Sequence, residues 1–187
     1  MLILLALALL NYNQAEDVMV GQETQGLLQN MKSMIAENEW TVTQQIQLDM
    51  SPEEETSVDI AKYIDGYEYI GIISIPSISL ELPVMSQWDY DRLKISPCRH
   101  VGSIEGGDLV IAAHNYKSHF GNLHKLQVED NLSITDMVGN VYRYEVVEIK
   151  IVKPTATEEV QQSGYDLVLY TCTLSGKTRV TVFCNEI

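Results

Sequence analysis

The spacing of hydrophobic and polar residues changes near residue 69 of the chain. Beyond that point, short runs of Val, Ile, Leu and Tyr are separated by Pro, Gly, Asn and Asp, which is typical of strands joined by turns in a sandwich or barrel. Only two short helical stretches fit between these runs, at residues 89–93 and 119–126. The predicted fold class is therefore mainly β, with strands at residues 70–75, 78–84, 108–113, 131–135, 141–152, 166–171 and 179–184.

The first third of the chain has a helical pattern instead. Residues 25–38 place apolar side chains at i, i+1, i+4, i+7 and i+8, which forms a single stripe along a helix. We expect a helix near residues 25–38 that docks this stripe on the β domain. The stripe consists of Leu27, Leu28, Met31, Met34 and Ile35.

Residues 1–10, MLILLALALL, are apolar throughout and show no amphipathic period. As a helix they would measure about 15 Å, roughly half the thickness of a bilayer core. We interpret them as the remnant of an N-terminal membrane anchor. The protein would then be a single-pass protein of the cell membrane, with the rest of the chain outside the cell. An ordinary buried helix is the alternative.

Charge separates the same two parts of the chain. Of 26 acidic and 12 basic residues, 12 acidic and 2 basic ones lie in residues 1–69, so most of the net charge of −14 is at the front. We expect an acidic stem over residues 11–66, including an acidic linker at 51–57, and a packed β domain over 67–187. The sequence pI near 4.5 argues against nucleic acid as a partner, because phosphate binding needs clustered Lys and Arg.

A candidate nucleophile follows the apolar run 167–171. Cys172 stands at the end of this predicted strand, just before a polar turn, where a thiol is exposed. Because side chains alternate along a strand, Cys172 shares a face with Val168 and Tyr170. Arg179 opens the next run, seven residues after Cys172. A hairpin across this short turn would place Cys172 and Arg179 side by side.

His114 ends another apolar run, residues 108–113, and opens a loop. A Cys, a His and an Arg at strand ends suit nucleophilic catalysis, because the thiolate is the reactive form and both cations favour it. The Arg could also stabilise an oxyanion. Each residue also has a simpler interpretation: a small buried hydrophobe for Cys172, a hydrogen-bonded strand end for His114 and an edge-strand charge for Arg179.

Four ordered motifs in this chain resemble those of the sortases. Residues 71–84, GIISIPSISLELPV, are similar to their opening strand pair, and Ala112-Ala113-His114-Asn115 resembles their catalytic histidine motif, followed by residues 120–123, FGNL. Residues 167–172, LVLYTC, are similar to the TLxTC signature, and residues 179–182, RVTV, to the arginine strand. The motifs extend from residue 69 to the C-terminus and leave the sortase subclass open.

The resemblance implies an eight-stranded sortase-type β-barrel with short helices and an N-terminal helical segment. It implies a membrane-anchored, extracellular cysteine transpeptidase that cleaves an LPxTG-like sorting signal between Thr and Gly and transfers the protein to an amine acceptor. That acceptor would be a cell-wall precursor or a pilin lysine. By the same resemblance, Cys172 is the nucleophile, His114 the acid and base, and Arg179 the oxyanion and substrate contact. Weaker candidates for substrate or oxyanion contacts are Thr171, Asn115 and the backbone N–H of Thr173.

Two other functions stay open: a cysteine peptidase that only hydrolyses, and a surface-anchored β interaction module without chemistry. The sequence predicts no cofactor and no metal site. His114, His119 and His124 are spaced by five residues, which does not place them on one helical face. Cys184 is expected in the core, and Cys98 is expected in a loop, where it is either a structural residue or a partly exposed thiol near the site.

Overall fold

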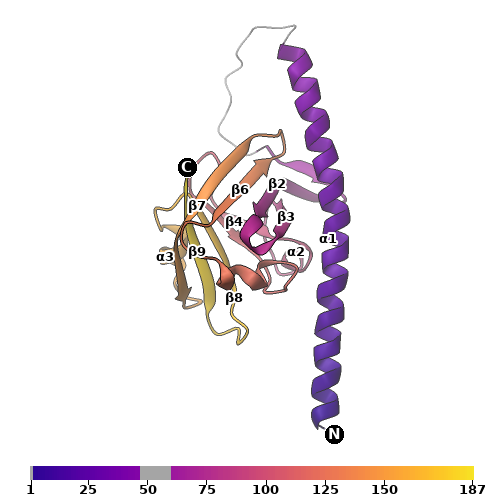
Figure 1. Ribbon diagram of the computed structural model, residues 1–187, viewed down its shortest axis with the longest axis vertical. Helices are drawn as coiled ribbons and strands as arrows, with labels where there is room; N and C mark the ends of the chain where they lie inside the picture. Colours follow the sequence, from indigo (N-terminus) through magenta and orange to yellow (C-terminus); the bar gives the residue numbers. More distant parts are fainter. Residues whose placement is uncertain (1, 47–59) are drawn as a thin grey trace.

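The computed structural model describes residues 2–46 and 60–187. Eight of its strands form a closed β-barrel. One long helix lies beside this barrel (Figure 1). The strands are β1 (Lys62–Ile64), β2 (Tyr67–Ile75), β3 (Leu80–Met85), β4 (Cys98–Val101), β5 (Leu109–Ala112), β6 (Asn131–Asp136), β7 (Val141–Val152), β8 (Leu167–Cys172) and β9 (Arg179–Glu186). The helices are α1 (Leu2–Ile46), η1 (Pro76–Ile78), α2 (Arg92–Ile95), η2 (Phe120–Lys125) and α3 (Thr157–Gln161).

The barrel strands follow the order β2-β3-β4-β5-β8-β9-β7-β6, and the pairing of β6 with β2 closes the ring. Two neighbouring pairs, β3 with β4 and β5 with β8, are parallel, and the other pairs are antiparallel. β1 lies outside the ring, since it pairs with β2 alone. The prediction of an eight-stranded barrel is confirmed. β1 and β4 were not predicted, because strands of three and four residues are too short to show a period.

Alternation along the strands divides their side chains between the barrel interior and the outer surface. In β8, Leu167 and Leu169 are fully buried in the large central cluster, whereas Val168 and Tyr170 belong to a separate cluster with α3. This is the predicted alternation. It places Cys172, two residues beyond Tyr170, on the outer face of the barrel.

The helix α1 is longer than the sequence analysis predicted. The expected helix near residues 25–38 is the middle of one continuous helix, Leu2–Ile46, because the polar stretch before it contains no proline to end the helix. The docking of the apolar stripe is confirmed: Leu28, Met31 and Ile35 are buried with barrel residues such as Tyr69 and Met85.

Figure 1 shows α1 along one side of the barrel, with its N-terminal end projecting past it. In the part of the chain that the structure describes, no helix is both long and apolar enough to cross a membrane. The predicted acidic linker at residues 51–57 lies outside the described residues. The membrane anchor therefore stays a prediction.

Candidate active site

Cys172 and Arg179 face each other across the last hairpin of the barrel. Cys172 ends β8, Arg179 begins β9, and the two residues are register partners. The backbone N–H of Thr173 donates to the carbonyl of Thr178 at 3.0 Å and closes the turn, where Gly176 has a φ of +69°. A glycine adopts this left-handed conformation without strain. The predicted neighbourhood of Cys172 and Arg179 is confirmed.

His114 joins them through the parallel pairing of β5 with β8. Ala112 is the register partner of Tyr170, and the backbone N–H of Ala113 donates to the Tyr170 carbonyl at 3.2 Å. Because the two strands run in the same direction, His114 and Cys172 leave the sheet at the same edge.

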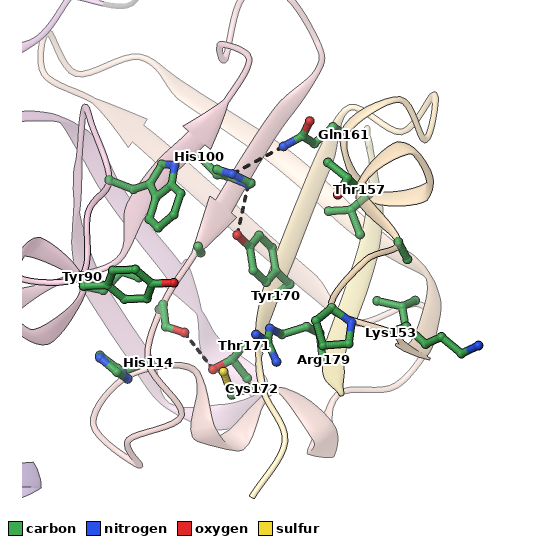
Figure 2. A pocket seen from close by; sticks show the side chains of 18 residues that line it. Tyr90, His100, His114, Lys153, Thr157, Gln161, Tyr170, Thr171, Cys172 and Arg179 are labelled. Carbon is green, nitrogen blue, oxygen red and sulfur yellow. Dashed lines mark hydrogen bonds between the residues drawn. The ribbon is translucent and has the colours of Figure 1, made fainter. Parts of the chain in front are cut away.

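His114, Cys172 and Arg179 line one pocket of about 200 Å³, which we call the His114 pocket. Figure 2 shows all three side chains at its lower end, with Cys172 drawn between the other two. The sequence-predicted trio, contributed by three different segments of the chain, therefore meets at one site.

Thr171 links the two strands that lead to His114 and Cys172. Its side chain is buried, and its hydroxyl donates to the carbonyl of Ala113 at 2.8 Å, which ties β8 to the residue before His114 (Figure 2). The sequence analysis expected a substrate contact at Thr171. This hydrogen bond holds together the strand ends that carry His114 and Cys172. Thr171 also lines the pocket, so a substrate contact stays a prediction.

Replacing Thr171 with valine should therefore destabilise the protein by about 1–3 kcal/mol, because the buried carbonyl of Ala113 would lose its donor. Urea unfolding at neutral pH measures this free energy. Thr181→Val is the matched control: Thr181 is fully buried, and its hydroxyl has no partner among the described residues, so its loss should be nearly neutral. Equal effects of the two substitutions would contradict the assigned role of Thr171.

Thr173 and Asn115 lie at the edge of the site. The Thr173 N–H already donates to Thr178 within the hairpin, so in this structure it is not directed at an oxyanion. Its hydroxyl is 3.0 Å from that of Thr178. Asn115 is half-buried and lines a second pocket that also contains Cys172. A contact of Asn115 with a substrate stays a prediction.

His114 is partly buried, and its surroundings lower its pKa. Its ring stacks on Tyr116, with centroids 4.8 Å apart and an interplanar angle of 24°. Burial lowers the pKa of His114, and the carboxylate of Glu16 opposes this effect. The neutral imidazole is thereby favoured near pH 7, which suits a group that first accepts a proton and then donates it.

The helix α1 holds the loop that follows His114. The carboxylate of Asp17 accepts hydrogen bonds from the backbone N–H groups of Lys117, at 3.2 Å, and Ser118, at 3.0 Å, and from the Ser118 hydroxyl. The Tyr116 hydroxyl donates to Glu16 at 3.3 Å. These contacts join residues about one hundred positions apart and were not predicted, because no local pattern encodes them.

The ring of His119 lies at a tilt beside Tyr116, with centroids 5.6 Å apart and an interplanar angle of 55°. Burial, and next the charge of His114, lower the pKa of His119 to about 4 from 6.5. The unfolded chain therefore binds a proton more readily than the folded chain between these values. The contribution of neutral His119 to the stability of the folded state is complete above pH 6.5 and is lost as the pH falls toward 4.

We expect the free energy of unfolding to fall by roughly 3 kcal/mol between pH 7 and pH 4 through His119, at about 1.4 kcal/mol for each unit of pKa shift. Urea titrations across this range measure it. The His119→Gln protein should lose most of this slope, while His124→Gln, at an exposed position, should keep it. An unchanged slope in His119→Gln would assign the pH dependence to other groups.

The opposite wall of the His114 pocket is a polar and aromatic cluster that the sequence analysis missed. The Tyr170 hydroxyl lies 3.0 Å from Nδ1 of His100, and the side-chain amide of Gln161 lies 3.4 Å from Nε2 (Figure 2). Trp88 packs edge-on against His100, with centroids 5.0 Å apart. The alternation along β8 pointed to Tyr170, since it shares a face with Cys172, but nothing in the sequence pointed to His100 or Gln161.

The three cysteines differ in their access to solvent. Cys98 and Cys184 are fully buried, and burial raises the pKa of each thiol to about 12. Cys172 is half-buried and lines a pocket. The expected core position of Cys184 is confirmed. Cys98 lies in β4 and not in a loop. Because it is fully buried, it is a structural residue and not a partly exposed thiol.

Comparison with known proteins identifies the family. The model of the sortase domain matches residues 73–187 of this chain. The chain belongs to the sortase family. Members of this family are cysteine transpeptidases associated with the cell surface.

Individual sortases agree with this assignment. Sortase A of Bacillus anthracis is 33% identical in sequence, and the match covers 58% of this chain and 54% of that protein. The chain thus spans about half the length of this curated relative. The crystal structure of sortase C1 from Streptococcus suis has a TM-score of 0.56 at 28% identity, covering 65% of this chain and 74% of that chain. A sortase D5 transpeptidase from Clostridium perfringens has a TM-score of 0.64 and covers 89% and 99%, but its 21% identity establishes the fold alone.

Proposed function

We propose that this sortase cleaves an LPxTG-like sorting signal between Thr and Gly and transfers the signal-bearing protein to an amine. One observation carries the proposal: Cys172, the most accessible of the three thiols, shares a pocket with His114 and Arg179. A thiol, an imidazole and a guanidinium can supply the nucleophile, the acid and base, and the oxyanion donor of acyl transfer through a thioester. The His114 pocket would take the sorting signal.

The first half of the reaction would form an acyl-enzyme. The Cys172 sulfur attacks the carbonyl carbon of the scissile bond as its proton passes to His114, which burial keeps neutral beforehand. The Arg179 guanidinium donates to the oxyanion of the tetrahedral intermediate. His114 then gives its proton to the departing amide nitrogen. The C–N bond breaks, and a thioester on Cys172 remains.

The second half would pass the acyl group to an acceptor amine, from a cell-wall precursor or a pilin lysine. The amine attacks the thioester carbonyl, the C–S bond breaks and an amide forms. The amine gives its proton to His114, which returns it to the Cys172 thiolate. Residues 1–10 would hold the enzyme at the membrane where such acceptors and the signal-bearing proteins meet.

A peptide-library screen tests the proposal. The protein is mixed with peptides of varied sorting motif, trapped at early times and examined by mass spectrometry for a thioester on Cys172. We expect an acylated Cys172 with peptides of the LPxTG type, cleaved after Thr. Release of acid alone, even with added amines, would indicate a hydrolytic peptidase. Failure of every peptide to acylate Cys172 would favour an interaction module without chemistry.

A further inference from the structure

A second pocket adjoins Cys172 on the side of the β8–β9 turn and η2. We call it the hairpin pocket. Its volume is about 650 Å³, and the only residues it shares with the His114 pocket are Thr171 and Cys172. The thiol therefore stands between two pockets. This arrangement suits a reaction in which one substrate acylates the sulfur and a different substrate removes the acyl group.

The walls of the hairpin pocket are basic, although the chain has a net charge of −14. Lys117, His124 and Lys125 line it, and no Asp or Glu does. In the described part of the chain, no salt bridge engages the ammonium group of Lys117 or Lys125. Cations on the walls of a concave site raise the local concentration of anionic ligands.

Two hydrogen bonds between side chains and backbone groups hold the basic wall. The Lys117 N–H donates to Asp17 of α1 at 3.2 Å, which fixes the backbone and leaves the side chain exposed. Nδ1 of His124 lies 2.9 Å from the carbonyl of Gly121, so this nitrogen is the donor and Nε2 is available to a ligand.

An apolar strip completes the hairpin pocket. Leu174 at the turn is 98% exposed, and Ile151 on β7 is 62% exposed. Large apolar side chains this exposed beside a reactive thiol suit contact with the alkyl part of a ligand.

The charge of this pocket bears on the acceptor amine. A simple protonated amine would be repelled by Lys117 and Lys125, whereas an acceptor that also carries a carboxylate would be attracted. Once bound, the same cations would lower the pKa of the amine and favour its neutral, nucleophilic form.

We propose that the hairpin pocket is the acceptor site and that it selects amines bearing a carboxylate on a short alkyl stem. The carboxylate binds to Lys117 and Lys125, the stem lies against Ile151 and Leu174, and the amine reaches the thioester on Cys172. This inference rests on the proposed function, because it concerns the amine that resolves the acyl-enzyme.

A matched pair of amines tests the inference in the full chain. The sorting peptide that acylates Cys172 is supplied together with either 6-aminohexanoate or 6-aminohexanamide, which differ only in the charge at the far end. We expect the acyl group to be transferred to 6-aminohexanoate about tenfold faster than to 6-aminohexanamide at low salt. This ratio of rates should shrink near 0.5 M salt, because the charges are screened. In the double variant Lys117→Gln/Lys125→Gln, the two amines should be used at rates that differ by no more than about twofold.

Lys62→Gln/Arg143→Gln is the charge-matched control, because Lys62 on β1 and Arg143 on β7 line neither pocket. It should keep the wild-type ratio. If Cys172 is acylated normally but both amines are used at equal rates, the assignment of the acceptor site is overturned and the proposed function stands. A tenfold ratio retained in Lys117→Gln/Lys125→Gln would overturn the role of the two lysines. Absence of the thioester on Cys172 would overturn the proposed function, and this inference with it.

Discussion

Replacing Cys172 with alanine should abolish acyl-enzyme formation and reduce peptide transfer by at least about 10⁴-fold, because no other group in the His114 pocket can form the thioester. The rate of cleavage of a fluorogenic sorting peptide and the mass of the trapped enzyme measure this. The fold should survive the substitution, since the Cys172 side chain is only half-buried at the end of its strand. Circular dichroism and urea unfolding check that it does.

Thiol alkylation supplies the internal control for this result. In the native protein, iodoacetamide should label Cys172 and spare Cys98 and Cys184, which are fully buried. In denaturant all three thiols should react. Native labelling should stop peptide cleavage, and the Cys172→Ala protein should take up no label before it unfolds. Peptide cleavage by Cys172→Ala at the wild-type rate would remove Cys172 from the mechanism.

The strands that the sequence predicts well are those long enough to show their period. β7 has the predicted bounds, Val141–Val152, and β8 and β9 were placed within two residues at each end. The short strands β1 and β4 give no such signal. β4 is held by its pairing with β5 and by one register position on β3, Met85 with Cys98, so its strand conformation depends on neighbours outside the segment.

The long helix shows a different limit of sequence patterns. Its middle was predicted because Leu28, Met31 and Ile35 recur on one face. The preceding turns present no apolar stripe, and they are held instead by polar contacts such as those of Asp17 with the loop after His114. A pattern of hydrophobicity cannot reveal contacts of this kind, since a carboxylate in a helix has the same signature whether it faces solvent or a loop.

The residues of the candidate active site also differ in how far the sequence predicts their positions. The facing pair Cys172 and Arg179 follows from strand alternation and a short turn, both of which are local. The position of His114 depends on the parallel pairing of β5 with β8, which joins segments 58 residues apart. Only the resemblance of the motifs to a known family supplied that relation. His100 and Gln161 needed the structure itself, because their sole signal is a contact in space.

Replacing Arg179 with alanine should reduce kcat/KM for the sorting peptide by about 10²–10³-fold, the usual cost of removing one oxyanion donor. The structure fixes how the side chain can act. Nη1 of Arg179 donates to the carbonyls of Gly176 and Thr178, each at 3.1 Å, so the hairpin holds one arm of the guanidinium. A guanidinium has five N–H donors, so others remain for a ligand, and Arg179 lines the His114 pocket.

Arg179→Lys separates the charge from the geometry. A lysine keeps the positive charge but lacks the planar fork, so it should recover only part of the lost rate. Arg143→Ala, at an exposed position on β7, is the matched control and should retain the wild-type kcat/KM. Because the oxyanion forms in both halves of the reaction, Arg179→Ala should slow both the acylation of Cys172 and the transfer to amine. A loss confined to KM would instead assign Arg179 to binding of the substrate ground state.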